Sequence, residues 1–264
     1  MAVVTSVDNA AVKAARKLAR RPARDAAGAF LVEGPQAVRE ALGHLTQLFV
    51  TDPGAELAVH ARQAGVAVTQ VSDRVLAALA DTVTPQGVVG VAELPALDLA
   101  DALAGARLAV VCWRVADPGN LGTVLRTADA GGADALVCTA GSVDPRNPKA
   151  VRASAGSLFH LPVVTDADPG GVLAACRAHG LQVVAADAGG PVPHTAVDFT
   201  APTALLLGNE AHGLPGEALA GADVVASVPI LGRAESLNLA AAAAVIVYEA
   251  ARQRGRPAKA RPCR

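Results

Sequence analysis

Short apolar runs alternate with amphipathic stretches along the first third of the chain. The runs at 30–34, 48–50, 66–71 and 86–92 have the length of β-strands, and the stretches at 35–42, 55–64 and 73–80 have helical spacing. A further helix is expected from Asp8 or Asn9 to about Arg21, where Pro22 stops it. This alternation predicts a small α/β domain built of layers.

A second alternation of strands and helices begins at Leu108. Continuous apolar runs predict strands at 108–113, 135–138, 161–164, 181–185 and 204–207. Helices are expected at 121–130 and 172–179, and residues 151–157 are expected to begin another. Strands without polar alternation are typical of a parallel sheet that is covered on both faces.

The last periodic stretch is rich in alanine and follows a polar loop. A strand-like piece ends at 229–231, residues 233–236 form the loop, and a helix is expected from Leu237 to about Arg252. Ser236 or Asn238 is expected to cap it, since both are good N-cap residues. The helix is almost wholly apolar, which predicts that it is buried.

Length and composition define the organisation further. The 264 residues are 52% hydrophobic but only 2% aromatic, so the core is expected to consist of Ala, Val and Leu. We expect domains at 1–95 and 107–252, a linker at 96–106 and a disordered basic tail at 253–264.

The four cysteines have no CxxC spacing, so neither a metal site nor a disulfide framework is expected. With no long apolar run, the chain is predicted to be soluble and cytoplasmic, without a membrane partner.

The net charge of −1 conceals an uneven distribution, because 12 of the 23 Lys and Arg residues lie in two short segments near the ends. The first segment places five cations at helical spacing on one face. This face is either solvated or contacts RNA phosphates. Its residues are Lys13, Arg16, Lys17, Arg20 and Arg24.

Three loops rich in polar residues and glycine follow predicted strands, at 117–126, 208–213 and 232–238. Each alone could be an ordinary turn. Together they place six polar side chains at strand ends of one sheet, where ligands of parallel α/β folds bind. A dinucleotide site is a weaker interpretation, because G-x-x-G is not the G-x-G-x-x-G fingerprint. The six are Asn120, Arg126, Asn209, Glu210, Ser236 and Asn238.

These loops resemble the three motifs of the SpoU/TrmH class of SPOUT RNA ribose methyltransferases. The first reads D-P-x-N-x-G-x-x-x-R, the second L-G-x-E-x-x-G-[LI], and the third [IV]-P-[IM]-x-G-x-x-x-S-L-N-x-[AS]. V-K-x-x-x-K-L and F-L-V-E-G in the first domain resemble its L30e-like substrate-binding domain. The resemblance implies an α/β fold with a deep trefoil knot and a parallel sheet, bound S-adenosylmethionine and a homodimer.

The resemblance also implies roles for individual residues. Arg126 resembles the family's catalytic arginine, and Asn120, Glu210, Ser236 and Asn238 complete the catalytic set. Arg152 and Ser154 lie in R-A-S-A-G-S, a segment that is near cofactor and RNA in the family. The cofactor is expected to contact Ala185, Leu207, Gly208, Asn209, Ile230, Ser236 and Leu239.

The expected activity is therefore transfer of a methyl group from S-adenosylmethionine to an RNA ribose 2′-OH, leaving S-adenosylhomocysteine and requiring no metal. Ribosomal RNA is favoured over tRNA, because an extra domain offers a second grip on structured RNA. The methylated nucleoside is left open between guanosine, uridine and adenosine. A tRNA 2′-O-methyltransferase, a non-catalytic knotted RNA-binding protein and a Rossmann-type oxidoreductase are the alternatives.

Overall fold

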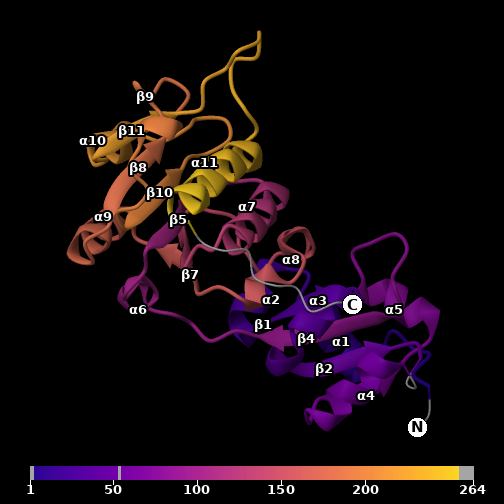
Figure 1. The fold of residues 1–264 in the computed structure, drawn as a ribbon. Helices are drawn as coiled ribbons and strands as arrows, with labels where there is room; N and C mark the ends of the chain where they lie inside the picture. The colour runs from indigo at the N-terminus through magenta and orange to yellow at the C-terminus, as the bar shows by residue number, and fades with distance from the viewer. Residues whose placement is uncertain (1–2, 53–54, 256–264) are drawn as a thin grey trace. The chain divides into compact units, whose positions relative to one another are not determined.

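The structure is a computed structural model that describes residues 3–52 and 55–255 (Figure 1). These residues form two compact units, and each unit combines segments that are distant in sequence. The first consists of Met1–Leu97, Ala116–Arg126 and Val143–Leu161, and the second of Asp98–Val115, Thr127–Ser142 and Pro162–Arg264. Most of the tail predicted at 253–264 lies outside the described residues.

The first unit contains a four-stranded sheet in the order β1-β4-β2-β3. β4 pairs antiparallel with β1 and β2, whereas β2 and β3 are parallel. All four strands fall where apolar runs predicted them. Their bounds are Ala29–Glu33 for β1, Leu45–Val50 for β2, Ala67–Gln70 for β3 and Val88–Glu93 for β4.

Helices pack against this sheet, and buried aliphatic side chains such as Val12 and Leu76 fill the space beside it together with Phe49. The helices of the unit's N-terminal segment are α1 (Ala10–Lys17), α2 (Arg21–Ala27), α3 (Pro35–Glu40), η1 (Leu42–His44), α4 (Glu56–Gln63) and α5 (Asp73–Leu79). The later segments add α8 (Pro148–Ser154) and η2 (Ser157–Phe159).

The prediction of one helix up to Arg21 was wrong. Asn9 caps α1 as expected, since its side chain accepts from the backbone N–H groups of Ala11 and Val12. The helix then ends at Lys17, and Pro22 lies in the first turn of α2. A proline is tolerated there because first-turn N–H groups have no helical partner. Pro22 therefore begins a helix and does not stop one.

The second unit contains a seven-stranded sheet in the order β7-β6-β5-β10-β8-β11-β9, and every neighbouring pair is parallel. This confirms the predicted parallel sheet. The strands are β5 (Leu108–Cys112), β6 (Ala135–Thr139), β7 (Val163–Ala167), β8 (Gln182–Ala186), β9 (Val192–Pro193), β10 (Thr203–Leu207) and β11 (Val224–Ser227).

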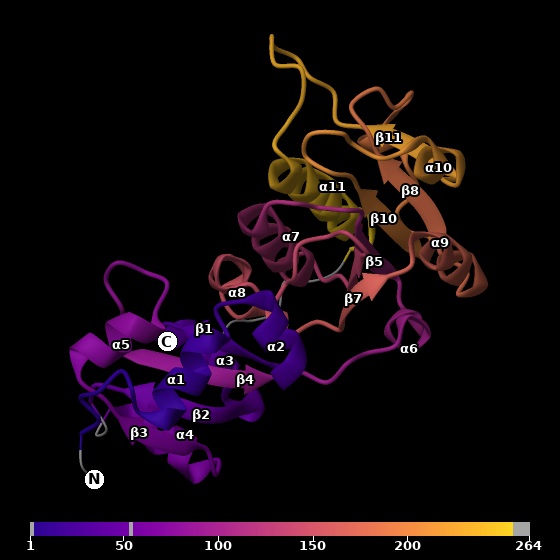
Figure 2. The same ribbon diagram turned by 180° about the vertical axis from the view of Figure 1, so that it is seen from behind.

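Helices cover both faces of this sheet, with α9 and α10 on one side and α11 on the other (Figures 1 and 2). The bounds are Leu99–Leu103 for α6, Pro169–Ala178 for α9, His194–Ala196 for η3, Gly216–Ala220 for α10 and Leu239–Gln253 for α11. Helix α7 (Pro118–Ala130) carries residues of both units. The expectation of helices on both faces is confirmed.

Three expected boundaries differ in the structure. The linker predicted at 96–106 contains α6, which buries Ala102 and Leu103. Helix α7 begins at Pro118, so the predicted loop at 117–120 is largely its first turn. Residues 151–157 end helix α8 instead of beginning one, because Ala155 and Gly156 adopt left-handed backbone conformations.

The region before α11 also differs from its prediction. Strand β11 ends at Ser227, and residues 228–238 form neither helix nor strand and extend away from the sheet (Figure 1). In this single chain α11 is not buried all round. Ala243, Ile246 and Val247 are buried, but Val245 and Tyr248 on the opposite face are 38% and 55% exposed.

Candidate functional site

In the second unit, the loop after β10 is closed on itself by backbone hydrogen bonds. Asn209 and Gly213 bond to each other in both directions, at 3.0 and 2.8 Å. A Cβ atom on Gly208 would lie 2.4 Å from the carbonyl carbon of Gly213. Only glycine fits there, so the second motif's first glycine permits a backbone turn that a side chain would prevent.

Asn209 fixes the same loop with its side chain. Its Oδ1 accepts from the N–H groups of Ala211 and His212, and its Nδ2 donates to the carbonyl oxygen of Arg114 at 2.8 Å. The Asn209 amide thus holds together the loops that follow β5 and β10. A cofactor contact by Asn209 stays a prediction. Glu210, one residue on, is exposed.

The third motif exposes a length of unpaired backbone. In the described chain, residues 228–237 make no backbone–backbone hydrogen bond. Asn238 caps α11 by accepting from Ala240 and Ala241, which decides between the two predicted caps. Ser236 is exposed and does not cap the helix. Its hydroxyl is therefore not occupied by helix capping.

The other predicted cofactor contacts differ in accessibility. Ala185 and Leu207 are buried inside β8 and β10, so a ligand at the sheet edge would first meet the residues that follow them. Ile230 and Leu239 are partly exposed beside the unpaired backbone. All four contacts stay predictions.

In the first unit, the first motif starts helix α7. Asp117 Oδ1 accepts from the Asn120 N–H at 2.8 Å, while Oδ2 accepts from Lys149 Nζ at 2.8 Å. The Lys149 hydrogen bond, with that from Asn120, lowers the pKa of Asp117. Arg126 lies two turns further along α7, exposed, and its guanidinium makes no hydrogen bond or ion pair with a described residue.

Helices α7 and α8 touch at Gly122. A Cβ there would lie 2.3 Å from the carbonyl oxygen of Ala150, so the helix contact itself requires the glycine. On α8, Ser154 is buried and donates its hydroxyl to the carbonyl of Val151 at 2.8 Å. The predicted RNA contact by Ser154 is therefore corrected, since its hydroxyl does not reach the surface.

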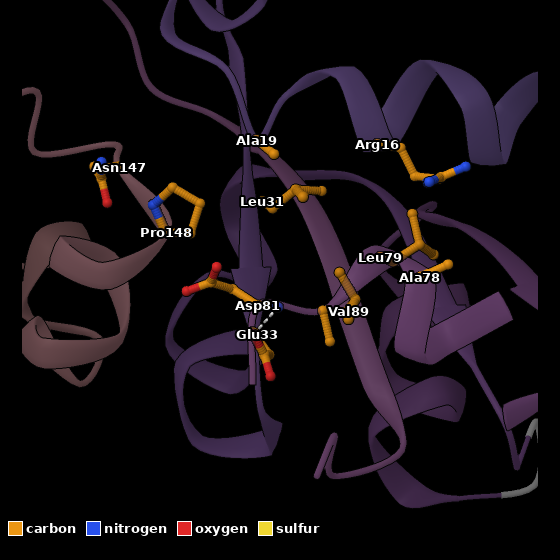
Figure 3. Close-up of a pocket in the computed structure, with 11 residues that line it drawn as sticks. Arg16, Ala19, Leu31, Glu33, Ala78, Leu79, Asp81, Val89, Asn147 and Pro148 are labelled. Atoms are coloured by element: carbon orange, nitrogen blue, oxygen red, sulfur yellow. Dashed lines mark hydrogen bonds between the residues drawn. The ribbon is translucent and has the colours of Figure 1, made fainter. Parts of the chain in front are cut away.

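Two carboxylates, Glu33 and Asp81, line a pocket of about 310 Å³ (Figure 3), and Arg152, also on α8, is close to both. It forms an ion pair with Asp81, and its NH1 lies 3.9 Å from Glu33 Oε2. Glu33 also accepts from the backbone N–H of Asp81 at 2.9 Å. The Arg152 guanidinium is thus already neutralised, and RNA binding by it stays a prediction. The pocket is lined by Arg16, Ala19, Leu31, Glu33, Ala78, Leu79, Ala80, Asp81, Val89, Asn147 and Pro148.

Four of the five cations predicted to share a face do line one surface groove of about 710 Å³. They are Lys13, Arg16, Lys17 and Arg20. Lys13 pairs with Asp8 at 2.9 Å, and the hydrogen bond from Lys13 lowers the pKa of Asp8. Among the described residues the other three have no ion-pair partner.

Arg24 does not belong to this surface, which corrects the predicted stripe. Its side chain is 3% exposed, and its Nε donates to Asp144 Oδ2 at 2.8 Å. NH1 donates to the carbonyls of Leu18 and Ala19 beyond the end of α1. Because the side chain is buried against these partners, its guanidinium is not at the surface where an RNA phosphate would bind.

Asp144 is the acceptor at the centre of this network. Burial alone would raise its pKa, but hydrogen bonds from the backbone and side chain of Arg146 and from Arg24 outweigh it, so the pKa of Asp144 is lowered. Sequence inspection missed Asp144, because its partner is 120 positions away. Within the described ranges, no His, Cys, Asp or Glu cluster could hold a metal ion, and no helix could cross a membrane.

Comparisons with known proteins cover both parts of the chain. Residues 107–248 match the model of the SpoU rRNA methylase family, and residues 9–90 match the MRM3-like substrate binding domain. The chain is 36% identical over 252 residues to the 23S rRNA (guanosine(2553)-2′-O)-methyltransferase RlmP of Bacillus subtilis, covering 94% of this chain and 98% of that protein. It is 38% identical to the 23S rRNA (uridine(2479)-2′-O)-methyltransferase of Streptomyces viridochromogenes, covering 90% and 87%.

Solved structures agree with the sequence comparisons. The AdoMet-bound rRNA methyltransferase of Sinorhizobium meliloti superposes with a TM-score of 0.86 at 36% identity, covering 95% of this chain and 97% of that one. The SpoU methyltransferase AviRb of Streptomyces viridochromogenes, in complex with AdoMet, gives 0.83 at 36% identity, covering 93% and 98%. With its parallel sheet, its three motif loops and a match over more than half its length, the chain belongs to the SpoU rRNA methylase family.

Proposed function

We propose that the protein is an S-adenosylmethionine-dependent 23S rRNA 2′-O-methyltransferase that works in the cytoplasm. The observation that carries this proposal is end-to-end similarity: this chain covers 98% of RlmP, a 23S rRNA 2′-O-methyltransferase. Two relatives modify guanosine and uridine respectively, so the nucleoside modified here is not inferred from them.

The unpaired backbone of residues 228–237 suits the proposed cofactor. The edge of an adenine ring needs hydrogen-bond donors and acceptors, and its faces need apolar contacts. Free backbone N–H and C=O groups supply the first, and Ile230 and Leu239 supply the second. S-adenosylmethionine brings a methyl group on a sulfonium that already has its leaving group. The protein is therefore required mainly to position the ribose.

We assign this positioning to Arg126. Its guanidinium is exposed and unpaired among the described residues, so its donors are open to a substrate. Arginine stays protonated in proteins, which argues against a role as the base that deprotonates the 2′-OH. Holding a phosphate or the 2′-OH in line with the methyl group is consistent with a fixed cation. Asn120, Glu210, Ser236 and Asn238 are proposed to complete the site.

The groove lined by Lys13, Arg16, Lys17 and Arg20 is proposed to bind RNA backbone. Replacing Arg16, Lys17 and Arg20 together with glutamine should weaken RNA binding and flatten its log–log salt dependence by about two to three units, since each lost phosphate contact removes roughly 0.7–0.9. Filter binding or fluorescence anisotropy at several salt concentrations measures this. The affinity for S-adenosylmethionine should stay unchanged.

A matched control removes two exposed cations elsewhere in the same unit, Arg39 and Arg74. This double glutamine variant should keep wild-type RNA affinity and salt slope. If the groove variant also binds as the wild type does, the groove cations only solubilise the domain.

The exposed apolar face of α11 is proposed to be covered by a second copy of the chain. On α11, Val245 and Tyr248 are 38% and 55% exposed and lie three residues apart, so they share one face of the helix. Leu237, which precedes the helix cap, is 40% exposed. Sedimentation at micromolar concentration should therefore give a dimer of the 26.3 kDa chain. Tyr248→Glu should shift it to monomer, because a charge would be buried without a partner.

The control for this dimer is Val59→Glu, at a single valine on α4 that is also 38% exposed. It should leave the sedimentation coefficient unchanged. A monomeric wild-type protein would contradict the proposed dimer.

The test of the function itself is direct. Purified protein is incubated with S-adenosylmethionine and, in separate reactions, with 23S rRNA, 16S rRNA and tRNA, and the 2′-O-methyl positions are mapped by mass spectrometry. The proposal requires one or few new methyl groups in 23S rRNA. Methylation of tRNA alone would instead support the alternative substrate, and S-adenosylmethionine binding without any methylated RNA would support a non-catalytic protein.

A further inference from the structure

Arg114 has a backbone conformation that is unusual for its residue type. It follows β5 and has a φ of 53°, in the left-handed region that normally favours glycine. Only two other described non-glycine residues have positive φ, Ala155 and Asp166. Ala155 ends helix α8, and aspartate tolerates this region. Arg114 has neither explanation.

The surrounding loops hold Arg114 in this conformation. Its N–H donates to Thr139 Oγ1 at 3.0 Å, and its carbonyl accepts from Asn209 Nδ2 at 2.8 Å. Thr139 ends β6 and is fully buried, while Asn209 begins the loop after β10. Strain of this kind persists only where neighbouring structure imposes it. The carboxyl ends of three adjacent strands therefore fix the Arg114 Cα–Cβ direction.

The Arg114 side chain has no structural task in the unit. It is exposed, and no described residue hydrogen-bonds to its guanidinium or forms an ion pair with it. A Cβ atom on Gly141 would lie 3.5 Å from Arg114 Cγ, so the loop after β6 runs beside the arginine stem. Glycine at position 114 would make the same backbone bonds without strain. The arginine is therefore better explained by its charge than by the fold.

We propose that Arg114 binds a phosphate of the RNA substrate at the carboxyl edge of the seven-stranded sheet. Guanidinium groups bind phosphate through two parallel hydrogen bonds, and a stem held by a fixed backbone loses less freedom on binding. The edge is where ligands of parallel α/β folds lie. This site rests on the proposed function, because it presumes an RNA substrate whose methylated ribose is close to that edge.

Three substitutions separate charge from backbone strain. Arg114→Gly removes both, Arg114→Gln removes the charge and keeps the strained Cβ, and Arg114→Lys keeps charge and Cβ. For each variant we would measure the melting temperature, the affinity for S-adenosylmethionine by calorimetry, and RNA affinity as a function of salt. Turnover on the RNA that the wild type methylates is the fourth readout.

Arg114→Gly should melt at or above the wild-type temperature, because glycine adopts the left-handed backbone conformation at a lower free-energy cost than arginine. The glycine and glutamine variants should bind RNA about ten- to a hundredfold more weakly, as expected for a lost charged hydrogen bond. The log–log slope of their RNA affinity against salt concentration should become shallower by roughly 0.7–0.9, the change expected for the loss of one phosphate contact. Arg114→Lys should keep that slope, and no variant should lose cofactor affinity.

Two results would overturn the assignment. Wild-type RNA affinity and salt slope in Arg114→Gly would show that no phosphate is bound there. Loss of S-adenosylmethionine affinity with an unchanged RNA salt slope would place the cofactor carboxylate at Arg114 instead. Failure of the proposed function is distinct from both, because the wild-type protein would then methylate no RNA.

Discussion

Replacing Arg126 with alanine is expected to lower methyl transfer by about a hundred- to a thousandfold, the loss seen when one group that stabilises a transition state is removed. The reason is that Arg126 is an exposed cation on α7 without a described partner, so the substitution removes a substrate contact and leaves the helix intact. Single-turnover methylation of saturating RNA measures the effect. S-adenosylmethionine affinity, measured by calorimetry, should stay within a few-fold.

Two variants serve as controls for this experiment. Arg126→Lys keeps the charge but loses the planar fork, so it should also be poor if two hydrogen bonds are needed. Thr123→Ala, on the same helix, removes an exposed hydroxyl that donates to the carbonyl of Gly119, and this variant should transfer methyl groups normally. Activity of Arg126→Ala within tenfold of wild type would refute the assignment.

Arg24→Ala is expected to lower the free energy of unfolding by about 3 kcal/mol, because it leaves a buried carboxylate without one of its counter-ions. Asp144 is 2% exposed and would keep, among the described residues, Arg146 as its one ionic partner. The carbonyls of Leu18 and Ala19 would also lose their donor. Urea unfolding at pH 7 gives the magnitude.

The matched control is Arg21→Ala, since Arg21 forms an exposed pair with Asp25 at 3.5 Å, and such pairs contribute about 1 kcal/mol or less. The double variant Arg24→Met/Asp144→Leu should recover much of the loss, because neither charge is then buried alone. An Arg24→Ala protein as stable as Arg21→Ala would show that the buried pair does not stabilise the fold.

The same pair predicts an acid-sensitive contribution to stability. The folded-state pKa of Asp144 is lowered, so its contribution is fully present above the ordinary aspartate value of about 3.9 and is lost as pH falls below it. The Asp144→Asn variant should therefore differ from the wild type in stability at neutral pH and approach it in acid.

Local sequence signals predicted most of the strands and helices for physical reasons that the structure makes visible. The strands of the second unit are continuous apolar runs because helices cover both faces of the sheet (Figures 1 and 2). Asn9 and Asn238 cap helices through their own side chains, a signal only a few residues long. The second and third motif loops likewise follow strands, β10 and β11, as the apolar runs before them predicted.

Predictions failed at residues whose local sequence is compatible with two structures, because only the tertiary contacts decide between them. Pro22 is compatible with a helix end or a first turn, and only the packing of α2 decides between them. Gly122 belongs to the first motif, yet the close neighbour that requires a glycine there is the backbone of α8. Arg24 shares the spacing of the exposed cations, yet folding places it against a carboxylate 120 positions away.

The sequence by itself therefore determined the class of fold and the family, because apolar periodicity, caps and motif spacing are local properties. The tertiary structure alone decided which charges face solvent and which neutralise one another. It also decided which glycines serve packing, and it placed Arg114 in a strained conformation between three loops. These properties depend on contacts between residues far apart in the chain, and such contacts cannot be recognised from the local pattern of apolar and polar residues.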